Sequence, residues 1–191
     1  MGGPYIGNAA TFVIETVFGI YILIVMLRFL LQLVHADFYN PLSQMLVTAT
    51  QPVLKRLRRF IPGYGGIDMS AAVLALLVQF VELWLVMLIL GHDAGLVGLL
   101  VLSVVRLLEL VIYVFMFSIF VLVLLSWIQP RSYNPVFGLL NSLSAPVMRP
   151  ARRLVPPLGG LDLSPIVVFL VLGVVLRAVI APLEHMALGL L

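Results

Sequence analysis

Four long apolar runs dominate the chain, and short polar stretches separate them. An α-helix rises about 1.5 Å per residue, so roughly 20 apolar residues cross a hydrocarbon core about 30 Å thick. Each run has about this length. The pattern therefore predicts an all-α integral membrane protein with four transmembrane helices. The predicted spans are residues 10–34, 69–90, 105–128 and 163–182.

Two of the polar stretches carry the same motif. Asn40 and Pro41 recur 94 positions later as Asn134 and Pro135, and the rest of the motif keeps this offset without a gap. Self-similarity at one fixed spacing indicates a duplicated unit. We predict two parallel tandem repeats, over residues 10–94 and 104–191, each made of a helix, a polar connection and a second helix. The motif residues are Asn40, Pro41, Pro52, Pro62, Gly65, Gly66 and Asp68 in the first repeat and Asn134, Pro135, Pro146, Pro156, Gly159, Gly160 and Asp162 in the second.

The polar connections predict helices that lie along the membrane surface, over residues 40–61 and 134–155. An Asn followed by Pro is a favourable helix start, because the Asn side chain caps the first turn and Pro has no N–H to lose there. Pro52 and Pro146 are expected to begin a second short helix in each connection. The paired glycines that follow permit positive φ, so they predict a sharp turn into the next span.

Most of the cations lie in these two connections, whereas the opposite end of the spans carries His92, Asp93, Glu184 and His185. By the positive-inside rule, both connections are predicted to be cytoplasmic and both termini to lie outside. The candidate cations for binding lipid or a partner are Lys55, Arg56, Arg58, Arg59, Arg149, Arg152 and Arg153.

The cation clusters have more than one interpretation. They fix topology and anchor the connections among anionic headgroups, where each Lys or Arg contributes about 1 kcal/mol. They also fit a docking surface for a specific lipid or for an acidic membrane or cytoplasmic protein. Nucleic acid is not an expected partner, because no aromatic residues alternate with the cations to stack on bases. A second copy of the chain, in a homo-oligomer, is a further candidate partner.

The segment 95–103 does not fit the four-span scheme, because it is apolar and would make the third span longer than a bilayer requires. A tilted, overlong helix is one solution. We favour a short interfacial or re-entrant segment on the outer side, broken near Gly98.

Charged residues also lie within or near the spans, where an ionised group costs about 2.5 to 3.5 kcal/mol and therefore needs a partner or water. Glu82 and Arg177 fall at nearly equivalent depths, so we predict that they pair. The alternative is an ion or proton path through the outer half of the membrane. The charged residues of the spans are Glu15, Arg28, Glu82, Arg106, Glu109 and Arg177.

Catalytic and metal chemistry find no support in the motifs. The chain has no cysteine, which excludes disulfides and thiolate chemistry. It has neither a His-Glu-x-x-His helix nor a Gly-x-Ser-x-Gly turn, and no complete phosphate-binding loop. We therefore expect no catalytic residues, no metal site, no cofactor and no enzymatic activity.

The two connections resemble those of a known family. The runs FYNPLSQMLVTATQPVLKRLRRFIPGYGGIDMS and YNPVFGLLNSLSAPVMRPARRLVPPLGGLDLSP are similar to the two halves of the YggT family of bacterial inner-membrane proteins, which is related to YlmG and to plastid YCF-type proteins. Ala71 stands where the second repeat has the family-like Pro165. The resemblance implies a multi-pass protein of the bacterial inner (plasma) membrane. It also implies links to osmotic or potassium tolerance, to cell division or to membrane-complex assembly, with no catalytic residues.

Two functions remain after these observations. The first is a non-enzymatic scaffold or assembly protein whose paired basic helices hold anionic lipid or a partner protein. The alternative is a transport-related protein that supports potassium or osmotic homeostasis as an oligomeric pore. The parallel arrangement of the repeats favours the first, because alternating access usually depends on inverted halves.

Overall fold

The computed structural model describes residues 3–93, 95–128, 135–155 and 162–191. Four helices within these ranges are long and apolar enough to cross a membrane, which confirms the all-α membrane fold. These spanning segments are Tyr5–Leu33, Met69–Leu90, Leu96–Ser126 and Ser164–Leu188. The elements in order are α1 (Gly3–Leu33), α2 (Pro41–Leu57), α3 (Met69–Leu90), α4 (Leu96–Ile128), α5 (Pro135–Leu154), α6 (Ser164–Val175), a π-helical turn η1 (Leu176–Ile180) and α7 (Ala181–Leu188).

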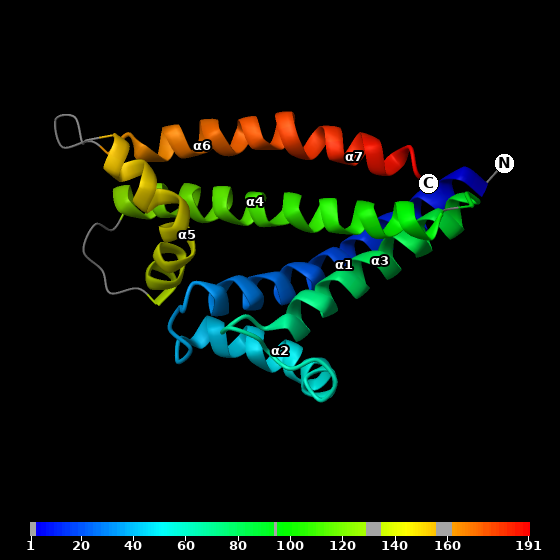
Figure 1. The fold of residues 1–191 in the computed structure, drawn as a ribbon, viewed down its shortest axis with the longest axis horizontal. Helices are drawn as coiled ribbons and strands as arrows, with labels where there is room; N and C mark the ends of the chain where they lie inside the picture. Colours follow the sequence, from blue (N-terminus) through cyan, green and yellow to red (C-terminus); the bar gives the residue numbers. More distant parts are fainter. Residues whose placement is uncertain (1–2, 94, 129–134, 156–161) are drawn as a thin grey trace.

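The two repeats run in parallel. In the first, α1 packs along α3, and in the second, α4 packs along α6, η1 and α7. The connecting helices α2 and α5 lie together at one end of the spans, and the N- and C-termini lie at the other (Figure 1). The side-chain amide of Asn40 donates to the backbone carbonyl of Pro135 at 2.7 Å, so the starts of α2 and α5 touch. Both polar connections therefore occupy the same side of the bundle.

The expectation of a separate segment at residues 95–103 is wrong. These residues form the first turns of α4, a continuous helix of 33 residues. Gly98 does not break the helix. A Cβ at Gly98 would lie 2.7 Å from the Leu190 carbonyl oxygen, so this glycine admits the C-terminal backbone against α4. Leu99 and Leu102 are buried there. The contact with the C-terminus therefore keeps the segment helical beyond the length that a bilayer requires.

The expectation that Pro52 and Pro146 begin new helices is also wrong. Each lies inside a single helix, α2 or α5. A proline inside a helix removes one backbone hydrogen bond, so packing must offset the loss. In α2 the buried side chains Ser43, Leu46, Thr50 and Leu54 continue on one face past the proline. Tertiary packing of that face keeps the helical register intact.

Candidate functional site

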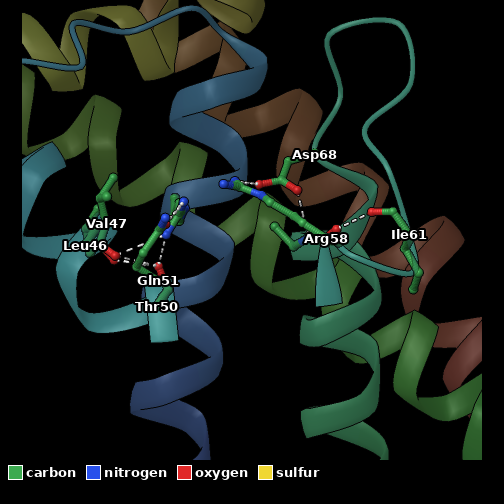
Figure 2. Close-up of polar contacts among 10 residues, drawn as sticks. Leu46, Val47, Thr50, Gln51, Arg58, Ile61 and Asp68 are labelled. Atoms are coloured by element: carbon green, nitrogen blue, oxygen red, sulfur yellow. Dashed lines mark hydrogen bonds and ion pairs between the residues drawn. The ribbon is translucent and has the colours of Figure 1, made fainter. Parts of the chain in front are cut away.

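One ion pair joins the end of α2 to the start of α3. The Arg58 guanidinium contacts the Asp68 carboxylate, whose side chain is only 3% exposed. The other carboxylate oxygen of Asp68 accepts the Ala71 N–H at 3.3 Å and caps α3 (Figure 2). Between the partners, Gly65 and Gly66 adopt φ of 61° and 85°, as the turn prediction requires. Asp68 thus fixes the turn back into the membrane.

The second repeat forms the equivalent pair. Arg152 Nε donates to Asp162 Oδ2 at 3.0 Å, and Asp162 Oδ1 accepts the Ser164 N–H at 2.9 Å. This pair is more exposed, with 55% of the Arg152 side chain and 41% of the Asp162 side chain accessible. Burial acts to raise the pKa of Asp162, but hydrogen bonds from Ser164 and Arg152 outweigh it, so the pKa lies below its usual value.

These pairs divide the seven candidate cations into two groups. Arg58 and Arg152 hold the connections in shape. The other five are exposed on α2, on the turn that follows it and on α5, and they make no ion pair among the residues that the structure describes. We call them the basic face: Lys55, Arg56, Arg59, Arg149 and Arg153. Because α2 and α5 lie at the same end of the bundle, and Arg59 follows directly after α2, all five belong to one side of the protein (Figure 1).

The motif residues at the helix starts behave as predicted where they are described. The Asn40 side chain accepts the Leu42 N–H at 3.0 Å and caps α2, and Pro41 opens that helix. Pro135 opens α5, and Pro62 lies in the turn that follows α2. The remaining motif residues lie outside the described residues: Asn134, Pro156, Gly159 and Gly160.

A further arginine, absent from the candidate cations, lies beneath α2. Arg28 of α1 is 7% exposed. Its guanidinium donates to the Val47 carbonyl at 3.1 Å, to Thr50 Oγ1 at 2.5 Å and to Gln51 Oε1 at 3.0 Å. Figure 2 shows these three acceptors grouped on one turn of α2. The sequence signal was the lone cation in an apolar run, but its acceptors come from a different helix and could not be assigned from spacing.

Arg28 lines a cavity of about 640 Å³ between α1, α2 and the turn before α3. Arg58 and Asp68 line the same cavity, together with polar side chains of α1 and α2 and the apolar Leu31 and Leu46. Two arginines against one aspartate give the lining an excess of positive charge. We call this space the Arg28 pocket.

The charged residues of the spans separate into distinct groups. Arg106 pairs with Glu109 at 3.3 Å and with Glu184 of α7 at 2.8 Å, at the end of the bundle opposite the basic face. Glu82 is buried and accepts a hydrogen bond from Gln79 on its own helix. Within the described ranges, Glu15 and Arg177 are exposed and without ion pairs.

The predicted Glu82–Arg177 pair is wrong. Glu82 lies on α3 and Arg177 on η1, and these two elements do not contact each other. Equivalent depth in the repeat does not bring them together, because α4 packs between the outer helices of the two repeats. Arg177 lies instead in the π-helical turn before Pro182, where the Ala181 N–H reaches back to the Leu176 carbonyl.

Comparison with known proteins agrees with the repeat and its motif. The CCB3/YggT family model matches the chain twice, at residues 7–89 and 101–183. The chain belongs to the CCB3/YggT family. It is 47% identical to the uncharacterized protein PA0392 of Pseudomonas aeruginosa over 95% of this chain and 93% of that protein. It is 34% identical to the uncharacterized protein YggT of Escherichia coli K12 over 88% of this chain and 87% of that protein. No solved structure matches it. Membership of the CCB3/YggT family confirms the resemblance seen in the two connections.

Proposed function

We propose that this protein is a non-enzymatic scaffold of the bacterial inner membrane, with the basic face toward the cytoplasm. There it holds anionic lipid or the acidic surface of a partner protein. The observation that carries the proposal is the division of the cations. Two arginines are used by the fold, whereas five exposed cations from both repeats gather at one end of the spans without ion pairs in the described ranges.

The orientation rests on charge. Cytoplasmic connections of membrane proteins carry an excess of Lys and Arg, and the end with the termini has Glu184 beside Arg106 and Glu109. Five cations near an anionic leaflet contribute about 5 kcal/mol at roughly 1 kcal/mol each, a contribution that salt screens. Binding to the basic face should therefore weaken as ionic strength rises.

The experiment is recovery of partners from native membranes by the full chain, at low and at high salt. The test variant carries Lys55, Arg56, Arg59, Arg149 and Arg153 all changed to Gln. Because these side chains are exposed, the thermal melt of the variant in detergent should match the wild type. We expect loss of the partners recovered at low salt. We expect about half this loss when only Lys55, Arg56 and Arg59 are changed, or only Arg149 and Arg153.

The control is the pair Glu15→Gln and Glu109→Gln, which alters charges inside the spans and leaves the basic face intact. We expect these variants to recover partners normally. Unchanged recovery by the fivefold variant would overturn the proposal. So would potassium flux through liposomes that contain the purified protein alone, if the two Glu substitutions abolish it.

A further inference from the structure

The Arg28 guanidinium is buried and makes no ion pair with a described residue, although Asp68 lines the same cavity. It carries five N–H donors, and the described residues accept three of them, all through neutral oxygens of α2. The Nε donor and one donor on Nη2 have no acceptor among those residues. No described Asp or Glu lies within ion-pair distance of Arg28. A buried cation in this state is stabilised by an anion that uses the remaining donors.

The fold itself does not require Arg28. The second repeat has Leu122 at the position 94 residues later, and Ala145 in place of Gln51. Even so, α5 follows α4 as α2 follows α1, and Arg152 pairs with Asp162 as Arg58 pairs with Asp68. The same connection is therefore built without this arginine in the second repeat, so a further role for Arg28 in the first repeat, such as binding a ligand, is open to test.

The position of the pocket suits a phosphate carried by a lipid. Arg28 lies five residues before the end of α1, about 7.5 Å along the helix axis. The spanning segment Tyr5–Leu33 is longer than the hydrocarbon core requires, so its end reaches the headgroup layer. This places Arg28 near the boundary between headgroups and hydrocarbon, in a cavity of about 640 Å³.

A second cavity shares part of its wall with the first. It has a volume of about 490 Å³, lies between α1, α2, α4 and α5, and shares Leu31 and Leu46 with the Arg28 pocket. Its lining is almost wholly apolar, with Leu27, Phe117 and Leu143 among the residues that face it. A positively charged site beside an apolar cavity matches a molecule with a phosphate head and an acyl chain.

We propose that the Arg28 pocket binds the phosphate group of one anionic phospholipid, with an acyl chain in the adjoining apolar cavity. Arg28 donates through Nε and Nη2 to two phosphate oxygens, and Gln51 and Thr50 hold the guanidinium in place. This site does not rest on the proposed function, because none of the five cations of the basic face lines either cavity.

The experiment is native mass spectrometry of the full chain in a neutral detergent, titrated with three probes. Phosphatidylglycerol carries both phosphate and acyl chains, diacylglycerol carries only the chains, and glycerol 3-phosphate carries only the phosphate. We expect phosphatidylglycerol to bind at one molecule per chain. The other two probes should bind at least about tenfold more weakly, because each lacks one half of the interaction.

The sharpest variant is Gln51→Glu. Gln51 Oε1 already lies 3.0 Å from the Arg28 guanidinium, so the substitution supplies a carboxylate in place and leaves the shape of the side chain unchanged. The new carboxylate neutralises Arg28 and competes with phosphate. We expect at least about a tenfold loss of phosphatidylglycerol binding. The matched control is Thr48→Glu, which makes the same change in net charge on an exposed position of α2 that lines neither cavity and does not belong to the basic face. It should bind as the wild type does.

Three results would overturn the proposal. The first is a wild-type chain that binds no phosphatidylglycerol. The second is an equal loss in Gln51→Glu and Thr48→Glu, which would assign binding to surface charge in general. The third is glycerol 3-phosphate binding as tightly as phosphatidylglycerol, which would assign the pocket to a soluble phosphate compound. Because Gln51 is exposed, Gln51→Glu should keep the melting profile of the wild type, and a melt recorded alongside verifies it.

Discussion

The Arg28 pocket and its counterpart in the second repeat are formed by equivalent helices but are lined by different side chains. A cavity of about 630 Å³ lies at the equivalent place between α4, α5 and α6, and Arg152 and Asp162 line it. At the positions of Arg28 and Ser43, however, this cavity has Leu122 and Phe137. The Arg–Asp pair is therefore part of how each connection folds, whereas the buried cation of the first repeat is replaced by Leu122 at the equivalent position. The two repeats therefore share the Arg–Asp pair and the helix arrangement, whereas the side chains that line the cavities differ.

The largest expected effect comes from moving the cation into the second repeat. Leu122→Arg places a guanidinium in the second repeat, where Ala145 stands at the position of Gln51 and offers no side-chain acceptor. We expect the free energy of unfolding to fall by about 2.5 to 3.5 kcal/mol, the cost of an unpaired ion in a span. Denaturant unfolding in detergent measures this change. Adding Ala145→Gln should recover part of the loss.

The reverse exchange sharpens the same point. Arg28→Leu combined with Gln51→Ala copies the second repeat into the first. Replacement of a buried cation by an apolar side chain is close to neutral, so we expect stability within about 1 kcal/mol of the wild type. Unfolding of this double variant would contradict the view that the fold does without Arg28.

The two Arg–Asp pairs should differ in strength because they differ in burial. Asp68→Ala removes both a helix cap and a buried carboxylate that pairs with Arg58, so we expect a loss of about 2 kcal/mol in unfolding free energy. Asp162→Ala removes an exposed pair and should cost less than about 1 kcal/mol. Thermal melts of both variants in one detergent provide the test, and equal losses would mean that burial does not distinguish the repeats.

The contact between the repeats depends on Asn40. Asn40→Ala removes the cap of α2 and the hydrogen bond to the Pro135 carbonyl, so we expect a loss of about 1 kcal/mol. Ser142→Ala is the matched control, because its hydroxyl bonds only to Gly138 of its own helix. A pair of cysteines or spin labels on α2 and α5 should also report wider separation in Asn40→Ala. Unchanged separation would mean that other contacts between α2 and α5 are sufficient.

The smallest effect is a dependence on pH in the second repeat. The pKa of Asp162 is lower in the folded protein than its ordinary value of 3.8, so the carboxylate stabilises the fold above about that pH. As pH falls through the folded pKa, protonation removes this stabilisation. Melting temperature recorded from pH 6 to about pH 3 should show a small fall that Asp162→Asn abolishes. A fall of the same size in that variant would assign the effect to other carboxylates.

Much of the architecture could be predicted from local patterns. The lengths of the apolar runs gave four spans, and the fixed offset gave parallel repeats. Asn40 before Pro41 and the glycines at 65 and 66 act through their own backbone, so their caps and turns could be assigned from neighbouring residues. The continuous helices at Gly98 and Pro52 could not, because packing against distant residues overrides the local tendency to break.

Apolar length predicted which segments cross the membrane, and the Asn-Pro and Gly-Gly motifs predicted where the first connection begins and turns, because these signals act through neighbouring residues. Which cations form contacts within the protein became clear only from the packing of the helices. Arg58 and Arg152 meet carboxylates ten residues away across a turn, and Arg28 meets oxygens of α2 about twenty residues away. Partners of this kind depend on how helices pack, and no spacing along the chain specifies that.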